Sequence, residues 1–356
     1  MKNDNRIQKL RQKLTEKEVE AILVSQPDNM YYLTGCEGLE GYLLVTGQDK
    51  IIATDFRYIE QAKRQSPDFT LFRIAGKMAE WLPVLFSGKT LSSLGFESQH
   101  LAFSLYQNLS DILIQAQLPI KVIPTCDLIE SLRIIKDAEE IEFISQAARI
   151  TEAAFRQIPE ILQAGISERE LAWKIERYMR EAGSQTVPFE VIVAAGPNAA
   201  LPHARPCDYM IRSGEPVVID IGSRFNNYGS DLTRTFCVGK PDDQFKKIYD
   251  IVLTAQTTVI SRIEGGMTGA EADAIARDII TQSGFGEAFG HSLGHGIGLV
   301  THENPHLGIN SKDVLTDGMV FTVEPGIYIS GWGGVRIEDD VVVENGKLRL
   351  LSAAEK

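Results

Sequence analysis

Acidic residues that interrupt apolar, strand-like runs are the feature that most constrains this chain. Asp220 lies in the run PVVIDIG, Glu324 in MVFTVEPGIYI and Glu338 in VRIEDDVVV. A carboxylate inside a packed sheet is rare without a partner, because burying an unpaired charge costs free energy. These strands are therefore expected to surround a site where a proton or a cation neutralises the carboxylates.

A further acid, Asp231, lies in YGSDLTRTF, and the turn-rich segment SRFNNYG separates it from Asp220. A hairpin over these residues would bring the two carboxylates side by side. The alternative, two surface turn acids, is disfavoured by the apolar run around Asp220. Strand alternation puts Glu338 and Asp340 on one face and Asp339 on the other. Periodicity alone leaves open which of the two same-face acids belongs to the site.

Histidine is concentrated near the C-terminus, since only His100 lies in the first 200 residues. The other five are His203, His291, His295, His302 and His306. Three of them fall among glycines in HSLGHGIGLVTHE, where backbone and ligand can approach closely. Imidazole is a common ligand of transition metals, although a structural histidine beside a tight turn is the alternative for any single one.

Four carboxylates and one imidazole would form a strongly acidic site if they converged. The five residues of this hypothesis are Asp220, Asp231, His295, Glu324 and Glu338. Their donor set suits two divalent cations, and its oxygen-rich character favours Mn, Co, Fe or Zn in a reactive site over a thiolate-bound structural zinc. Two metals that share carboxylates lower the pKa of a bridging water and stabilise a tetrahedral transition state.

The order of expected elements divides the chain into two domains. Residues 1–130 alternate helices and strands, as in a smaller α/β domain. The helix start at Asp137 and Glu140 opens the second domain, residues 135–356, whose helices and antiparallel-looking strands predict an α+β architecture. Asn345–Gly346 predicts a two-residue hairpin. Further helices are expected over 6–18, 58–64, 167–181, 243–264 and 268–283.

Composition excludes several classes of partner. The formal net charge of −12 disfavours binding to nucleic acid or to anionic membranes. No stretch reaches the roughly 18 uncharged apolar residues that a membrane helix needs. The opening MKNDNRIQKL lacks the apolar centre of a signal peptide. We therefore expect a cytoplasmic protein that binds neither nucleic acid nor membrane.

Six motifs, in this order, resemble those of the creatinase/methionine aminopeptidase superfamily, and within it the Xaa-Pro peptidases, namely aminopeptidase P and prolidase. The motifs are ALPHARP, VVIDIG, SDLTRTF, HSLGHGIGLVTHENP, GMVFTVEPGIYI and GGVRIEDDVVV. The front domain resembles the family's N-terminal domain through DNMYYLTG and TDFRYIEQA. One such motif is weak, whereas six in order are specific. The resemblance implies an α+β pita-bread catalytic domain preceded by a smaller α/β creatinase-like domain.

The resemblance also implies a dinuclear metal site. Asp220 would bind one ion, and Asp231 and Glu338 would bridge both. His295 and Glu324 would bind the other ion. Glu324 would also accept a proton as a metal-bridging hydroxide attacks the scissile carbonyl. Manganese is the expected ion, with cobalt, zinc and iron as alternatives.

The remaining site residues follow from the same resemblance. His203 and His302 would steady the substrate and the developing oxyanion. His291 and Arg336 would line the substrate pocket, where Arg336 could meet a carboxylate or support the metal shell. The expected partners are proline-containing oligopeptides or dipeptides and, by analogy, a second copy of the chain in a homodimer.

The expected activity is that of an Xaa-Pro aminopeptidase, with Xaa-Pro dipeptidase as the alternative. Some dipeptide-specific prolidases carry an arginine for the substrate carboxylate in the segment between His306 and Glu324, which has none here. His306 itself is assigned to the surface or the pocket rim. Methionine aminopeptidase is disfavoured by the long N-terminal domain. Creatinase-type hydrolysis and a non-catalytic binding protein on the same fold are disfavoured by the full ligand set.

Overall fold

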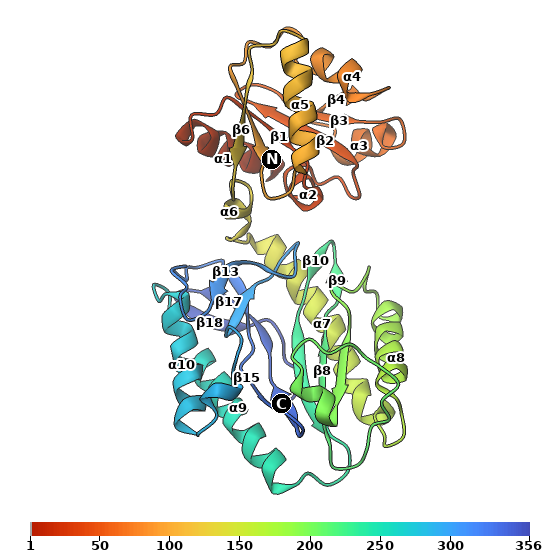
Figure 1. Ribbon diagram of the computed structural model, residues 1–356, viewed down its shortest axis with the longest axis vertical. Helices are drawn as coiled ribbons and strands as arrows, with labels where there is room; N and C mark the ends of the chain where they lie inside the picture. The colour runs from red at the N-terminus through yellow and green to blue at the C-terminus, as the bar shows by residue number, and fades with distance from the viewer. Residues whose placement is uncertain (1) are drawn as a thin grey trace. The chain divides into compact units, whose positions relative to one another are not determined.

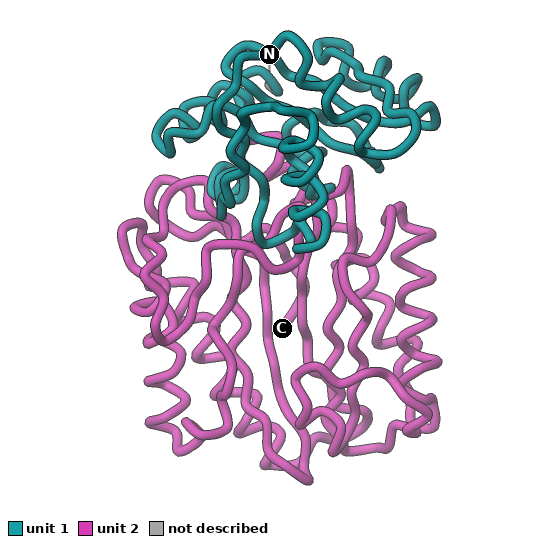
Figure 2. Tube along the Cα trace, turned by 45° about the horizontal axis from the view of Figure 1, so that its top comes forward, with its two compact units in different colours: residues 1–133 teal, residues 134–356 magenta. Residues whose placement is uncertain are grey.

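The computed structural model describes residues 2–356, and the chain divides into two compact units (Figure 2). Unit 1 extends to Arg133, and unit 2 runs from Ile134 to Lys356. Each unit has its own core of buried apolar side chains. Over residues 2–356, no helix is both long enough and apolar enough to span a membrane.

Unit 1 is an α/β domain around a six-stranded mixed sheet with the order β4-β3-β2-β1-β5-β6. Its strands are β1 (Ala21–Val24), β2 (Gly41–Thr46), β3 (Lys50–Thr54), β4 (Thr70–Arg73), β5 (Ser93–Glu97) and β6 (Lys121–Thr125). Strands β1, β5 and β6 are parallel, whereas β2 runs antiparallel to both β1 and β3. The expected α/β class of this unit is confirmed.

Helices alternate with these strands along the chain. They are α1 (Lys2–Glu16), α2 (Pro27–Thr34), α3 (Ile59–Gln65), α4 (Met78–Leu85), α5 (Phe103–Gln115) and α6 (Glu130–Arg133). Helix α1 ends before the expected residue 18, because Glu18 has a left-handed φ of 55° that an α-helix cannot continue through. Residues 27–34, 78–85 and 103–115 were not expected to be helical.

Unit 2 contains four long helices at the expected positions. They are α7 (Ala138–Ile161), α8 (Glu168–Glu181), α9 (Asp243–Arg262) and α10 (Gly269–Gln282), with short 3-10 helices η1 (Gly196–Ala200) and η2 (Gly286–Ala288). The capping boxes that begin α7 and α10 are complete, because cap and third residue exchange hydrogen bonds. At α8 only Ser167 accepts the capping bond, while Glu170 pairs with Lys174.

The strands of unit 2 are paired antiparallel. They are β7 (Ile192–Ala195), β8 (Pro216–Ile221), β9 (Arg224–Phe225), β10 (Tyr228–Gly229), β11 (Leu232–Cys237), β12 (Gly294–Gly296), β13 (Glu303–Leu307), β14 (Val320–Val323), β15 (Gly326–Ile329), β16 (Gly333–Arg336), β17 (Asp339–Glu344) and β18 (Lys347–Leu350). They form the sheets β11-β8-β7 and β13-β12-β14-β17-β18 and the pairs β9-β10 and β15-β16. The expected hairpin at Asn345–Gly346 joins β17 to β18.

The strands of unit 2 lie between two pairs of helices, α7 with α8 and α9 with α10 (Figure 1). Each pair covers its own apolar cluster, one including Leu171 and Ile219 and the other including Val252 and Phe321. On β8, Ile219 and Ile221 face the cluster of α7 and α8. Alternation therefore turns Asp220, between them, away from those helices. This α+β arrangement confirms the expected class of the second domain.

Candidate metal centre

The acids of the site lie where strands are interrupted. Glu324 stands between β14 and β15, Glu338 between β16 and β17, and Asp231 directly before β11. The expectation that Glu324 and Glu338 lie within strands is therefore wrong. Pro325 explains one interruption, because proline has no N–H to donate to a neighbouring strand.

Asp220 and Asp231 are brought together by β8 and β11, but they are not directly opposite. The register pairs Asp220 with Thr233, two residues beyond Asp231. Residues two apart on a strand share a face, so the two carboxylates lie diagonally on the same side of the sheet. Thr233 occupies the position opposite Asp220.

Three side chains form a group that could hold a metal ion. One ligand atom from each of Asp231, His295 and Glu338 lies within 4.8 Å of the others. His295 Nε2 is 3.8 Å from Asp231 Oδ2 and 3.3 Å from Glu324 Oε1. Asp220 lies nearby, because Arg336 donates both to its carboxylate and to the Thr233 hydroxyl, which in turn donates to Glu338. All five residues that were expected to bind metal thus occupy one region of unit 2.

His295 is oriented with Nε2 toward the carboxylates. Its Nδ1 lies 3.1 Å from the carbonyl oxygen of Gly296, which can only accept, so the proton is on Nδ1 and Nε2 offers a lone pair. The backbone N–H of His295 donates to Thr322 Oγ1 (3.1 Å), and that hydroxyl donates to Glu324 Oε1 (3.1 Å). A Cβ on Gly294 would lie 2.0 Å from the Thr322 carbonyl oxygen, which explains the glycine beside this histidine.

The electrostatics of the group fit a bound cation. Burial, followed by the charges of neighbouring acids, raises the pKa of Asp231 and of Glu338 well above the ordinary carboxyl value. Burial also raises the pKa of Glu324 to about 7. Asp220 Oδ1 and Asp231 Oδ1 are buried and find no hydrogen-bond donor among residues 2–356. Divalent cations would satisfy these oxygens and offset the repulsion, and four carboxylates with one imidazole suit such ions.

The structure separates the three consecutive acids at the start of β17. Glu338 belongs to the ligand group, whereas Asp340 Oδ2 accepts the backbone N–H of Asp231 at 3.0 Å. Asp339 points the other way and forms a buried ion pair with Arg234 at 2.7 Å. The two faces thus agree with the expected alternation, and Asp340 holds the backbone of Asp231.

Arg336 connects two of the acids. Arg336 Nη2 donates to Asp220 Oδ2 at 2.6 Å, and Arg336 Nε donates to Thr233 Oγ1 at 3.1 Å. The Thr233 hydroxyl in turn donates to Glu338 Oε2 at 2.6 Å. Arg336 thus contacts the carboxylate of Asp220, one of the residues expected to bind metal, while its expected place in a substrate pocket stays a prediction. Sequence reasoning missed Thr233, although its place two residues after Asp231 put it on the same strand face.

Both ring nitrogens of His291 are used within the protein. Nδ1 donates to the Ser292 carbonyl oxygen (2.8 Å), so Nε2 accepts from the Tyr328 hydroxyl (3.0 Å). The Tyr328 hydroxyl oxygen also accepts a hydrogen bond from Arg336 Nη1 at 2.8 Å. Burial and the Arg336 charge lower the pKa of His291 to about 4 and keep it neutral. His291 thus anchors Tyr328, a residue that sequence reasoning missed.

His203 and His302 are exposed. The ring centroid of His302 is 4.2 Å from that of His295. Although the residue as a whole is exposed, partial burial of the His302 ring, followed by the charges of His295 and His203, lowers the pKa of His302 to about 4. His306 is exposed, lies opposite His295 in the β12–β13 register and approaches Ser292 Oγ at 3.2 Å.

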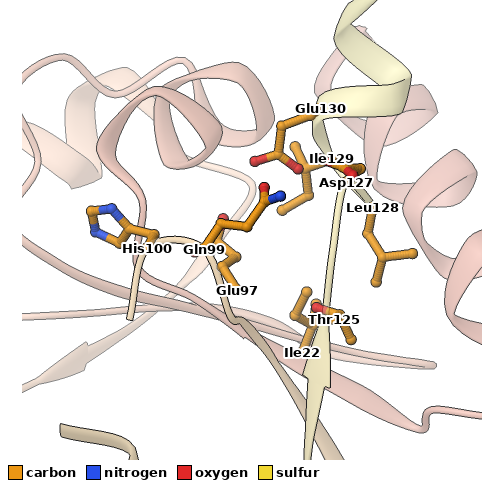
Figure 3. A pocket seen from close by; sticks show the side chains of 9 residues that line it. All are labelled: Ile22, Glu97, Gln99, His100, Thr125, Asp127, Leu128, Ile129 and Glu130. Carbon is orange, nitrogen blue, oxygen red and sulfur yellow. The ribbon is translucent and has the colours of Figure 1, made fainter. Parts of the chain in front are cut away.

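Unit 1 has a small pocket of its own, following the carboxyl ends of β5 and β6 (Figure 3). It is lined by Ile22, Glu97, Gln99, His100, Thr125, Asp127, Leu128, Ile129 and Glu130. The Glu97 carboxylate accepts from the backbone N–H groups of Ser25 (2.7 Å) and Gln26 (2.8 Å) and from Asn29 Nδ2 (2.7 Å). This acid therefore joins β5 to the start of α2. The expected site residues all belong to unit 2.

Comparison with known proteins shows similarity over nearly the whole chain. Residues 142–345 match metallopeptidase family M24, and residues 6–135 match the creatinase/prolidase N-terminal domain. The chain is 39% identical over 349 residues to the Xaa-Pro dipeptidase of Pyrococcus furiosus, and this alignment covers 97% of each chain.

Solved structures are also similar to this chain over nearly its whole length. The Xaa-Pro dipeptidase from Bacillus anthracis superposes with a TM-score of 0.96 at 39% identity, covering 99% of this chain and 98% of that one. The X-Pro aminopeptidase from Thermotoga maritima superposes with a TM-score of 0.89 at 34% identity, covering 98% of each chain.

Fold and site together define a metal-dependent hydrolase with a pita-bread catalytic domain and a creatinase-like N-terminal domain. The chain belongs to metallopeptidase family M24, and its relatives include proteins named Xaa-Pro dipeptidase and X-Pro aminopeptidase. The family and the fold class expected from the sequence are thus confirmed.

Proposed function

We propose that this chain hydrolyses the bond before proline at a dinuclear metal site. Asp220, Asp231, His295, Glu324 and Glu338 are the residues that would hold the ions. The proposal is carried by the convergence of Asp231, His295 and Glu338 within 4.8 Å. When bound, the ions would supply Lewis acidity and a water nucleophile of lowered pKa. Manganese is proposed first, with cobalt, zinc and iron as alternatives.

Glu324 is proposed to move the proton. Its Oε1 lies 3.3 Å from His295 Nε2 and accepts from the Thr322 hydroxyl at 3.1 Å, so the carboxylate is held in the ligand group. A carboxylate held there can take a proton from the attacking water and deliver it to the proline nitrogen as the peptide bond breaks.

His203 and His302 are proposed to bind the scissile carbonyl. Both are exposed, His302 lies against His295, and the charge of His203 acts on both His302 and Glu324. These observations support a role in which the two N–H groups meet a substrate at the ligand group. A donor aimed at the developing oxyanion contributes about 3 kcal/mol to transition-state stabilisation. Arg336 is proposed to orient Asp220, and His291 to position Tyr328 in the substrate pocket.

Dipeptides are proposed as the preferred substrates. Supporting this choice, three relatives named Xaa-Pro dipeptidase are 38–39% identical, whereas the X-Pro aminopeptidase from Thermotoga maritima is 34% identical. The second candidate is an Xaa-Pro aminopeptidase that acts on longer peptides. It is favoured by the absence of arginine between His306 and Glu324.

Metal-reconstituted protein assayed on Ala-Pro and Ala-Pro-Ala separates the two activities. We expect a higher kcat/KM for release of alanine from the dipeptide. A higher kcat/KM on the tripeptide would establish the aminopeptidase instead, and no release from either would contradict the proposed function. The homodimer and the cytoplasmic location expected from the sequence stay predictions, and light scattering of the pure protein checks the first.

A further inference from the structure

Glu168 is a fully buried carboxylate with no part in the chemistry above. It is the first residue of α8, and 0% of its surface is exposed. Burying a carboxylate is costly unless hydrogen bonds replace its water. Its partners here are two backbone N–H groups, a side-chain amide and a thiol.

These partners come from the two ends of one loop. Oε1 accepts from the Ala195 N–H at 2.8 Å and from Asn198 Nδ2 at 3.0 Å. Oε2 accepts from the Cys207 N–H and from Cys207 Sγ, both at 3.1 Å. One side chain therefore holds the start and the end of segment 195–207 together.

His203 lies within this clamped segment. The chain there makes two tight turns, in which Leu201 N–H donates to Asn198 O (3.0 Å) and Ala204 N–H donates to Leu201 O (3.1 Å). Leu201 is 59% exposed and His203 is exposed, whereas Ala199 and Ala204 on either side of them are buried. Between these two buried residues, the Pro202 carbonyl oxygen accepts a long hydrogen bond from Arg336 Nη1 at 3.4 Å. The ends of the segment are a further restraint on exposed Leu201 and His203, because exposed loops move more than the elements that they connect.

We propose that Glu168 is a positioning residue that holds the 195–207 loop so that His203 meets the substrate. The inference rests on the proposed role of His203. Glu168 touches neither substrate nor metal ligand, and it acts through the loop alone.

Glu168→Gln tests this with little change of volume. An amide has one acceptor oxygen and one NH2 group, so it can accept from one end of the loop but faces donors at the other end. Because two donors that face each other cannot form a hydrogen bond, that end of the loop loses its contact with residue 168. Glu170→Gln is the matched control, because Glu170 is on the same helical turn, is exposed and pairs only with Lys174 (2.8 Å) among the ion pairs that the structure describes.

A double-mutant cycle on Ala-Pro hydrolysis measures the coupling. We expect Glu168→Gln to lower kcat/KM on the order of 10- to 100-fold with metal content unchanged, since small misplacements of binding groups cost that much. In the His203→Ala background, Glu168→Gln should cause no further loss of kcat/KM. An equal loss in both backgrounds, or no loss in either, would overturn the proposal. Asn198→Ala removes one donor and gives a milder test should Glu168→Gln not fold.

Hydrogen exchange of residues 196–206 gives a readout that is independent of activity. We expect faster exchange in Glu168→Gln and wild-type exchange in Glu170→Gln. Unchanged exchange in Glu168→Gln would overturn the clamp even if activity fell. If the wild-type enzyme cleaves no Xaa-Pro peptide, the proposed function fails, and if His203→Ala is fully active, the proposed role of His203 fails. In both cases the exchange data still test whether Glu168 holds the loop.

Discussion

Three of the four acidic residues of the proposed metal centre are each supported by a different neighbour. Arg336 holds Asp220, the Thr233 hydroxyl holds Glu338, and the Asp340 carboxylate holds the backbone of Asp231. Supporting groups of this kind orient metal ligands and tune their affinity. Replacing a ligand residue and replacing a residue that supports it should therefore have measurably different effects on metal binding and on kcat/KM.

Asp231→Ala and Glu338→Ala are each expected to reduce bound metal and to abolish most activity, because each removes a ligand proposed to be shared. The loss of kcat/KM should exceed the about 10- to 100-fold that loss of a supporting residue costs. Elemental analysis and kcat/KM on Ala-Pro provide the measurement. Asp278→Ala, on the exposed face of α10, is the control. Full metal content and full activity in either variant would refute the bridging assignment.

Thr233→Val removes only the hydroxyl that lies between Arg336 and Glu338. We expect metal affinity to fall about 10- to 100-fold, since Glu338 loses a donor that fixes its orientation. Titration of the metal-free protein with Mn²⁺, followed by calorimetry, measures the change. Thr257→Val on the exposed face of α9 serves as the control, and equal affinity in both variants would contradict the supporting role.

The elements that were anticipated are those with strong local signals. Helices α7, α9 and α10 begin at side-chain caps, and these caps are visible in the sequence. Helices α4 and α5 lack a side-chain cap hydrogen bond, and α4 contains Pro83, so their helical structure depends on packing against the sheet. This is why local patterns missed them.

Glu97 links two elements of unit 1, and its titration predicts a pH dependence. Burial raises the pKa of Glu97 above its ordinary value, despite the hydrogen bonds that it accepts. The folded state therefore holds this proton more tightly than the unfolded state. The free energy of unfolding of unit 1 should fall as pH rises from the ordinary carboxyl range through the raised pKa, and Glu97→Gln should lose this slope.

Urea unfolding at several pH values checks this. Fluorescence of Trp81, buried in unit 1, reports that unit alone when Trp173 and Trp332 are replaced by phenylalanine. The same background with Glu97 intact is the reference. An identical slope in Glu97→Gln would show that another group is responsible.

At the scale of the whole molecule, the metal centre and its residues belong to one of the two compact units. A ligand that binds only the folded state stabilises it by RT ln(1 + [L]/Kd), about 2.7 kcal/mol at a hundredfold excess over Kd. Metal binding should therefore stabilise unit 2 in particular.

Chelation of the metal is expected to increase hydrogen exchange in the strands of unit 2 and to leave that of the β1–β5–β6 region unchanged. Exchange followed by mass spectrometry, with and without chelator, measures both regions in one sample. Restored protection after Mn²⁺ is added back is the control. Equal destabilisation of both units would contradict a purely local effect.

The sequence by itself determined the acids and histidines available, the helix caps, the α/β and α+β classes and, through six ordered motifs, the family. These depend on residue type and on spacing within short segments. The resemblance already assigned Glu338 to the ligand group, whereas the tertiary structure decided that Asp340 accepts from the Asp231 backbone and that Glu168 joins the two ends of the loop of His203. Asp231 and Asp340 are 109 residues apart, and only the pairing of distant strands fixes which side chains meet.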